Sequence, residues 1–227
     1  MFFAEKIKSI KPTDRVLEIG PGTSPHKRSD VFLEKKYDND EEFSKQVGHN
    51  DKFNTSKQVI FYEGDIFPFT DNEFDYVICS HVLEHVDNVE VFLSEIFRVS
   101  NKGYFEYPLI YYDYLYNFNV HTNFLKFDGE TLYYKKKSDS SLNEFSPVQL
   151  FFVKSLQAGH NKMITDLLHF IMEGFEWNKP FKICKTQDLN NLILKIDSLP
   201  EPSYLTTRSL LSQVYKKTLR LIKQYKS

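Results

Sequence analysis

The sequence has few cysteines, no long apolar run and almost no net charge. Its two cysteines, Cys79 and Cys184, are too few for a disulfide framework, and each lies in an apolar run that predicts a reduced thiol packed in the core. The net charge of −2 gives no overall field that would recruit nucleic acid or an anionic membrane. No stretch approaches the roughly 20 apolar residues of a membrane span, and the charged N-terminal segment lacks the pattern of a signal peptide. We therefore expect a cytoplasmic protein.

What is present is an alternation of short apolar runs with polar connections. A chain of 227 residues suits a single domain over 1–227. The apolar runs that predict buried strands lie at 16–19, 31–33, 59–62, 76–79 and 103–107. Strands that alternate with polar or helical connections are typical of a parallel sheet in an α/β fold. Only ten residues separate Gly20 from Val31, so the first crossover helix must be reduced to a turn or a fragment.

The later segments predict a different kind of structure. Asp128-Gly129 between two apolar runs predicts a β-hairpin with a type I′ turn, and 147–175 has the spacing of helices. Two late strands are expected around 175–177 and 181–184. Two further segments are polar. Residues 38–57 are expected to form a helix or a surface segment, and residues 206–226 are expected to form a basic helical tail. The tail predicts a solvated face over a docked apolar stripe, with a membrane or RNA role as the alternative.

The first strand ends in the most informative motif, Glu18-Ile19-Gly20-Pro21-Gly22. Two glycines one residue apart after a strand let the backbone approach a nucleotide-like ligand closely. The dinucleotide fingerprint G-x-G-x-x-G would need a third small residue where this chain has Pro25. The short crossover also offers no helix N-terminus to hold a pyrophosphate. The motif therefore favours a nucleoside cofactor without a pyrophosphate.

At this motif the chain resembles a known family. The run RVLEIGPGTSPH is similar to motif I of class I S-adenosylmethionine-dependent methyltransferases, and FDYVICSHVLEHV resembles the fourth strand and following helix of their type 11 group. The resemblance covers residues 13–108. It implies a three-layer Rossmann-like α/β sandwich with a mostly parallel seven-stranded sheet whose last hairpin strand is antiparallel. It also places 109–173 as an inserted hairpin-plus-helix cap over the acceptor side.

The resemblance further implies a set of cofactor-binding residues. The glycines would face the methionyl and ribose parts of the cofactor, Glu34 the ribose hydroxyls, and Asp65 the adenine amine. The full expected set is Glu18, Gly20, Gly22, Glu34, Asp65, Ile66, Ser80 and His81. Carboxylates suit both contacts, because they accept hydrogen bonds from hydroxyls and amines. Each residue also has a plainer interpretation: Glu34 as an ordinary strand-end charge and Asp65 as a turn former.

A second motif overlaps this set. His81-Val82-Leu83-Glu84-His85 matches H-x-x-E-H, the inverted zinc-protease motif. On a helix that begins at Ser80, His81 and His85 would lie one turn apart and both could ligate zinc. Such a site needs a third ligand, for which Glu144 and Glu173 are candidates. Because the motif directly follows the fourth strand of a methyltransferase pattern, we expect no bound metal.

Aromatic residues crowd the segment 104–127, with ten in 24 residues. They predict either an acceptor pocket that excludes water near the sulfonium or a core of large side chains. His121 lies among them and is either a base or a structural histidine. The candidate catalytic residues are therefore His81, His85 and His121.

The expected reaction is methyl transfer from S-adenosylmethionine, with S-adenosylhomocysteine as product, to an oxygen, nitrogen or carbon of an acceptor. We expect a small-molecule or saccharide acceptor and no nucleic acid, because no nucleic-acid-binding module is recognisable. Two alternatives remain. One is a non-catalytic module of the same fold that binds the cofactor, and the other is a zinc hydrolase built on His81–His85.

Overall fold

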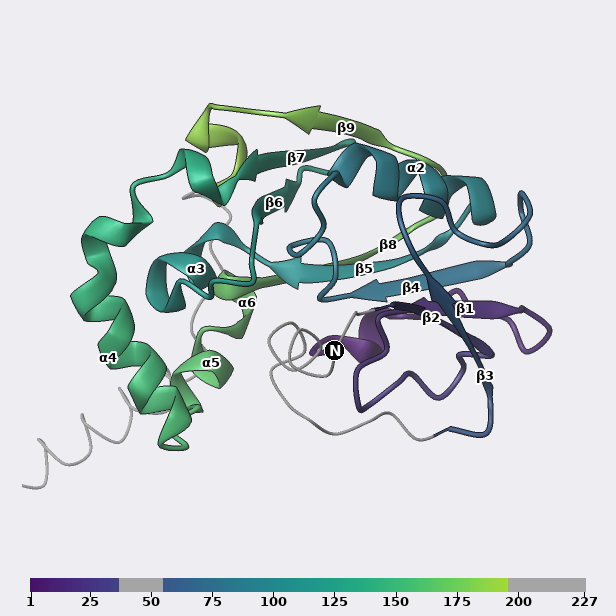
Figure 1. The fold of residues 1–227 in the computed structure, drawn as a ribbon, viewed down its shortest axis with the longest axis horizontal. Coiled ribbons are helices and arrows are strands. Elements are labelled where there is room, and N and C mark those ends of the chain that lie inside the picture. Colours follow the sequence, from purple (N-terminus) through teal and green to yellow (C-terminus); the bar gives the residue numbers. More distant parts are fainter. Residues whose placement is uncertain (37–54, 196–227) are drawn as a thin grey trace, which may run out of the picture.

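A six-stranded sheet forms the centre of the molecule (Figure 1). The computed structural model describes residues 1–36 and 55–195. The strand order is β3-β2-β1-β4-β5-β8, in which the first five strands are parallel and β8 runs antiparallel to β5. The strands are β1 (Val16–Ile19), β2 (Val31–Lys35), β3 (Gln58–Tyr62), β4 (Tyr76–Ser80), β5 (Gly103–Pro108) and β8 (Met172–Trp177). The expected α/β fold with a mostly parallel sheet is confirmed.

The centre of the sheet lies at β1, which is buried on both faces. Leu17 pairs with Val31 of β2 on one side and with Val77 of β4 on the other. Strands covered on both faces are continuously apolar, which is why these runs were visible in the sequence. The chain leaves β1 toward β2 and returns to its other side with β4. Such a reversal opens a crevice at the carboxyl ends of the strands, where ligands of open α/β sheets bind.

The connection from β1 to β2 contains turns and no helix, as its length predicted. The carboxylate of Asp30 accepts a hydrogen bond from the Val16 backbone N–H at 2.9 Å and so joins the end of this connection to β1. Most of 38–57 and the whole of 206–226 lie outside the described residues.

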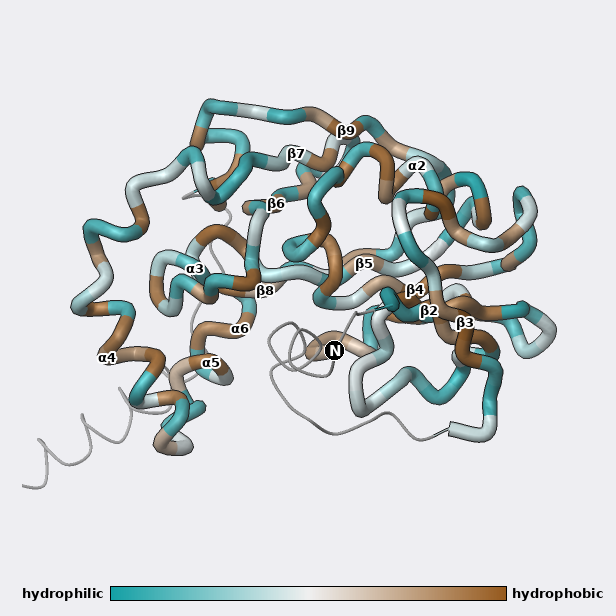
Figure 2. The backbone as a smooth tube through the Cα atoms, in the orientation of Figure 1, coloured by the Kyte–Doolittle hydropathy of each residue, from teal (hydrophilic) through white to brown (hydrophobic). Residues whose placement is uncertain are grey.

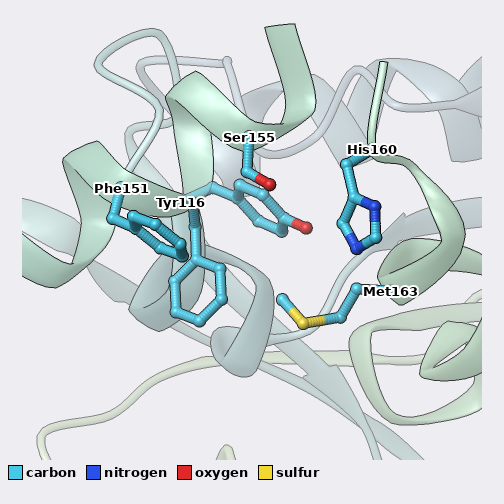
Figure 3. A pocket seen from close by; sticks show the side chains of 6 residues that line it. Tyr116, Phe151, Ser155, His160 and Met163 are labelled. Carbon is cyan, nitrogen blue, oxygen red and sulfur yellow. The ribbon is translucent and has the colours of Figure 1, made fainter. Parts of the chain in front are cut away.

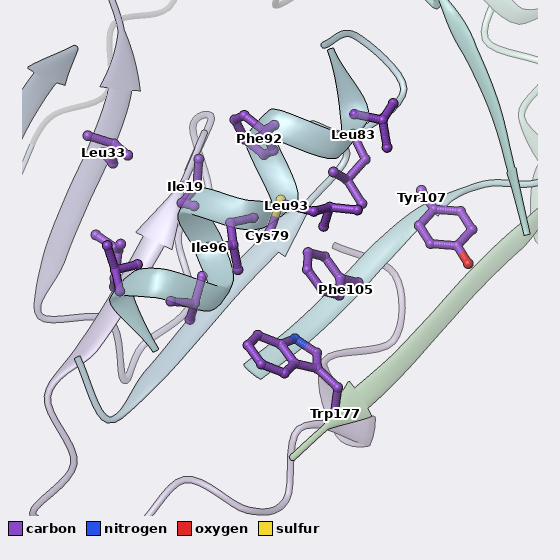
Figure 4. Close-up of a cluster of buried hydrophobic side chains, with 14 of the residues drawn as sticks. Ile19, Leu33, Cys79, Leu83, Phe92, Leu93, Ile96, Phe105, Tyr107 and Trp177 are labelled. Atoms are coloured by element: carbon purple, nitrogen blue, oxygen red, sulfur yellow. The ribbon is translucent and has the colours of Figure 1, made fainter. Parts of the chain in front are cut away.

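One face of the sheet is covered by α2 (Val89–Val99) (Figure 4). Leu93 and Ile96 of this helix are fully buried in the main hydrophobic core. The expected helix start at Ser80 is wrong. Residues 81–88 form turns, and the helix begins after Asn88, whose side chain accepts a hydrogen bond from the Val91 N–H as an N-cap.

The N-terminal segment covers part of the opposite face. It contains the short 3₁₀ helix η1 (Ala4–Lys6), and Ile7 and Ile10 pack on a second buried cluster. That cluster consists of Val16, Tyr76, Ile78 and Tyr104.

Between β5 and β8 the chain forms a hairpin and several helices, as expected for 109–173. The elements are α3 (Ile110–Tyr116), β6 (Asn123–Phe127), β7 (Thr131–Lys136), η2 (Lys137–Asp139), η3 (Leu142–Phe145), α4 (Ser146–Gln157), α5 (Lys162–Asp166) and α6 (Leu168–Ile171). The hairpin turn is not type I′, because Gly129 has φ +104° while Asp128 is not left-handed. Asp128 instead pairs with Thr131 across the turn through a backbone hydrogen bond of 3.2 Å.

The strand β9 (Lys182–Lys185) corrects the expected seven-stranded sheet. It pairs in parallel with β7, so that β6, β7 and β9 form a separate three-stranded sheet, and η4 (Leu189–Asn191) follows it. The outer edge of β7 in the hairpin accepts β9 as its parallel partner. Cys184 of β9 is exposed, so its expected place in the core is wrong, whereas Cys79 of β4 is buried.

The helix α4 lies at the outer edge of the molecule (Figures 1 and 2). Several of its apolar side chains are exposed, with Phe151 at 68%. In the part of the chain that the structure describes, no helix is both long and apolar enough to cross a bilayer.

Candidate functional site

The glycine turn after β1 forms one wall of the candidate site. Gly20 and Gly22 have φ values of +60° and +58°, a conformation that side chains disfavour. The Gly20 N–H donates to the Leu33 carbonyl at 2.9 Å, and a Cβ on Gly20 would lie 2.6 Å from Val82 Cγ2. A Cβ on Gly22 would meet nothing within 4 Å. The turn is therefore closed against residues 81–88 at Gly20 and open at Gly22, where a ligand can approach the backbone.

Glu18 supports this turn from beneath. Its Oε2 accepts hydrogen bonds from the His26 N–H at 2.9 Å and the Ser29 hydroxyl at 2.5 Å. Burial raises the pKa of Glu18 despite these two bonds. Its contacts tie the connection between β1 and β2 to the sheet, so Glu18 positions the glycine turn.

Glu34 lies at the end of β2, directly after the residue that bonds Gly20. Within the described residues its half-buried carboxylate accepts a single hydrogen bond, from the Lys35 N–H at 3.2 Å. Burial raises the pKa of Glu34 to about 7. A carboxylate can accept several hydrogen bonds, so this one retains capacity for donors from a ligand.

Asp65 and Ile66 follow β3 and are both exposed. The Ile66 side chain is 73% exposed, although a branched apolar side chain is normally buried. Because parallel strands end at one edge of the sheet, these two residues belong to the same edge as Glu34 and the glycine turn.

Ser80 and His81 end β4, and both contact Glu106 of β5. Glu106 Oε1 lies 3.2 Å from the Ser80 hydroxyl and 2.9 Å from His81 Nε2. Glu106 is fully buried and also accepts hydrogen bonds from the backbone N–H groups of Phe2 and Phe3. The sequence analysis did not identify Glu106; the signal available was a single acid inside an apolar strand.

His81 is held between two carboxylates, with Nδ1 3.3 Å from Glu84 Oε1 on the other side. Burial alone would lower its pKa, but the hydrogen bond to Glu106 and the negative charges of Glu106 and Glu84 outweigh burial and raise the pKa of His81 to about 9. Burial would raise the pKa of Glu106, but its hydrogen bonds with His81 and the Tyr104 hydroxyl lower it to about 2. The two carboxylates thus favour the imidazolium form of His81, which works against a role as a base; that role stays a prediction.

The other two candidate histidines face each other, with ring centroids 5.0 Å apart. His85 Nδ1 lies 2.9 Å from the Val120 carbonyl, and His121 Nδ1 lies 2.9 Å from Asp113 Oδ2. Asp113 is buried and also forms an ion pair of 2.8 Å with Lys137.

The aromatic segment divides into two parts. Its larger part is core, because Tyr104, Phe105 and Tyr107 of β5 are fully buried. A smaller part surrounds His121: Tyr112 stacks on its ring at 6.1 Å, and Phe118 lies 5.5 Å from it. The core interpretation is therefore confirmed for the β5 residues, and the acceptor pocket stays a prediction for the residues around His121.

The zinc triad considered as an alternative does not form. Residues 81–85 are not helical, so His81 and His85 do not share a helix face. Glu173 is engaged with the Tyr107 hydroxyl and Lys126, and Glu144 is exposed on η3. The structure instead brings Glu84 together with the two facing histidines, and one candidate ligand atom from each lies within 4.8 Å of the others.

A cavity of about 150 Å³ lies elsewhere, between α3, α4 and the turn before α5 (Figure 3). It is lined by Tyr116, Phe151, Phe152, Ser155, His160 and Met163. None of these belongs to the strand ends, so this cavity is separate from the candidate site.

A comparison with known proteins matches the part of the chain that carries the glycine turn. The methyltransferase domain family matches residues 17–105. The chain is 36% identical over 101 residues to the sterol 24-C-methyltransferase erg6 of Schizosaccharomyces pombe. That match covers 41% of this chain and 27% of the yeast enzyme, so the chain matches about a quarter of its relative's length.

Solved structures include similar domains. A methyltransferase of Thermotoga maritima, described as dependent on S-adenosylmethionine, has 21% identity over 47% of this chain and 49% of its own, with a TM-score of 0.33. A methyltransferase from Bacillus halodurans has 20% identity over 49% of this chain and 55% of its own, with a TM-score of 0.34. Residues 17–105, which carry the glycine turn and the strand ends, are thus the part of the chain that is similar to the methyltransferase domain family.

Proposed function

We propose that this chain binds S-adenosylmethionine in the crevice at the carboxyl ends of β1–β4 and transfers its methyl group to a small-molecule acceptor. The observation that carries the proposal is the glycine turn, open at Gly22, beside the under-bonded carboxylate of Glu34. A nucleoside fits this pair of features. Its ribose offers two hydroxyl donors to the carboxylate, and the open glycine turn lets the nucleoside come close to the protein backbone.

We assign the remaining contacts from the same edge of the sheet. Glu34 accepts hydrogen bonds from the ribose hydroxyls, Asp65 accepts one from the adenine amine, and the exposed Ile66 covers one face of the ring. Ser80 and His81 lie beside the methionine end. Through Glu106, these two are fixed in position before any ligand arrives.

The cofactor supplies a methyl group that is already activated as a sulfonium. The chain's own residues then have mainly to orient the acceptor and exclude water. The insertion supports this role, because the N–H groups of Thr122 and Asn123 donate to the Glu84 carbonyl and hold β6 against residues 81–88. Tyr112, Phe118 and His121 stand on this side and form the acceptor wall.

A small molecule is the acceptor class that these features favour. The aromatic rings offer a dry, largely apolar surface, which is what small-molecule sites usually present. The yeast relative is named for a sterol, which is a small molecule, while a saccharide is the second acceptor that we would test. The free thiols of Cys79 and Cys184 support a cytoplasmic location.

The test begins with S-adenosylhomocysteine. A ligand that binds only the native state at 100 times its Kd stabilises the fold by about 2.7 kcal/mol, which a thermal shift detects. We expect saturable calorimetric binding with one site and a matching rise in melting temperature. Absence of both at millimolar ligand would refute the cofactor site.

A screen with methyl-labelled cofactor and pooled sterols, phenols and sugars then separates an enzyme from a binding module. Transfer of label to one acceptor class supports the proposal. Tight cofactor binding with no transfer to any class would favour the non-catalytic alternative.

A further inference from the structure

Glu84 is buried in a way that calls for a partner. Its side chain is 1% exposed, and neither carboxylate oxygen makes a hydrogen bond within the described part of the chain. The nearest histidine nitrogens are His81 Nδ1, which forms an ion pair with Glu84 at 3.3 Å, and His85 Nε2 at 3.9 Å. Buried carboxylates are normally hydrogen-bonded, paired in good geometry or bound to a metal ion.

The two histidines beside Glu84 are oriented as metal ligands. The Val120 carbonyl can only accept, so His85 carries its proton on Nδ1 and leaves the Nε2 lone pair facing Glu84. The Asp113 carboxylate likewise accepts a hydrogen bond from the Nδ1–H of His121. The Nε2 lone pair of His121 is then free to bind a metal ion. Metal-binding histidines typically donate their second N–H to a backbone carbonyl or a carboxylate, and this pair has one of each.

The segments that carry the three side chains are fixed to each other. The Asn123 side chain donates to the carbonyls of Leu83 at 3.1 Å and Val86 at 2.7 Å. The Thr122 N–H donates to the Glu84 carbonyl at 2.7 Å. The geometry is therefore largely preformed, which reduces the entropy lost when an ion binds.

We propose that Glu84, His85 and His121 form a binding site for a divalent first-row transition metal ion. Two imidazoles and one carboxylate are the ligand set of several catalytic zinc sites and of facial triads that bind iron. With three protein ligands, coordination positions remain open for water or for an oxygen of a substrate.

The position of this site gives it a role in the proposed reaction. Val82, two residues before Glu84, contacts Gly20, so the segment that carries Glu84 and His85 also borders the glycine turn. If the proposed function holds, the acceptor is a molecule whose hydroxyl or other oxygen binds the ion and is thereby oriented and acidified. His85 and His121 would then act on the acceptor through the ion and not as bases.

The experiment measures metal binding alone, without cofactor or acceptor. The protein is stripped with a chelator, dialysed, and titrated with Co²⁺, Zn²⁺ and Mn²⁺ by calorimetry, with Co²⁺ absorption as a second readout. We expect one equivalent of at least one ion. Failure of all three to bind at millimolar concentration would overturn the proposal, whatever the cofactor does.

Variants locate the ion. His121→Gln should weaken binding at least tenfold and change the Co²⁺ spectrum, and Asp113→Asn should weaken it about 10- to 100-fold by releasing the His121 ring. His160→Gln, outside the site, is the matched control. Equal affinity in His121→Gln and His160→Gln would place the ion elsewhere and overturn the assignment. Apo-protein melting curves check folding, and Asp113→Asn carries the test if His121→Gln does not fold.

Discussion

The interior of the sheet and its junction with the insertion are stabilised by different kinds of contact. The sheet is stabilised by close-packed apolar side chains, among them Phe105 and Leu93, which are fully buried. The junction with the insertion adds buried polar groups such as Glu84, Asp113 and Asn123 to apolar contacts such as the stacking of Phe127 on Phe175. Apolar packing is non-directional and sets stability, whereas hydrogen bonds and charges fix orientation. Substitutions in the sheet should therefore unfold the protein, and substitutions at the junction should alter its site.

The largest effect is expected in the sheet. Phe105→Ala removes a ring that stacks on Trp177 at 5.7 Å and should cost about 3–5 kcal/mol of unfolding free energy. Phe151→Ala on α4, where the side chain is 68% exposed, should change stability by less than about 0.5 kcal/mol. Urea unfolding of both variants measures the difference. Equal losses would mean that the outer face of α4 is buried in solution.

A smaller loss of unfolding free energy is expected at the junction between the sheet and the insertion. Asn123→Ala leaves the carbonyls of Leu83 and Val86 without their side-chain donor, which should cost about 1–3 kcal/mol. Asn143→Ala, which removes one exposed contact to Asn117, is the control and should cost little. Limited proteolysis should cut Asn123→Ala faster around 81–88. An unchanged cleavage pattern would show that the insertion does not depend on this contact.

The same division explains what the sequence could predict. The five parallel strands were recognisable because each is a largely apolar run that a glycine, a proline or a polar residue ends, as in Val16–Gly20. The helix start was misplaced because Val82, Val86 and Val89 repeat at helical spacing although the first two lie in a turn. The available signal was Asn88, a good N-cap residue directly before Val89. The helical interpretation of 147–175 was wrong at its end, where Met172 begins the strand β8.

The contacts between the insertion and the sheet were not predictable in this way. Glu84 meets His121 because β6 packs on the turn after β4, and no local periodicity encodes that approach. The strand β9 was assigned to the wrong sheet for the same reason: its residues specify a strand, while the free edge of β7 specifies its partner.

At the cofactor edge, Glu34→Ala should weaken binding of S-adenosylhomocysteine by about 1–3 kcal/mol, because two charge-assisted hydrogen bonds are lost. The fold should persist, since this carboxylate makes one weak backbone contact. Glu63→Ala is a matched control, because Glu63 is an exposed acid just after β3 that pairs only with Lys36 among the described residues. Calorimetry compares the two. Equal affinity would move the ribose contact to another residue.

The smallest effect is a pH dependence of the same interaction. The pKa of Glu34 is raised to about 7 by burial, so in the free protein the carboxyl is mostly neutral at pH 6 and mostly ionised at pH 8. The ionised form offers both oxygens to the ribose hydroxyls, whereas the neutral form offers fewer acceptors. If only the ionised form binds, the apparent Kd should fall about tenfold from pH 6 to pH 8, as the competent fraction rises.

The free energy of unfolding changes with pH in the opposite direction to the binding affinity. A carboxyl whose pKa is higher in the native state contributes stability below its unfolded value, near 4.5, and loses it as pH rises through about 7. Glu34→Gln should therefore flatten both profiles over this range. The ligand's own titration is the same for both proteins, so the difference between their binding curves isolates Glu34. Parallel curves for wild type and Glu34→Gln would show that the Glu34 carboxylate does not contact the ribose.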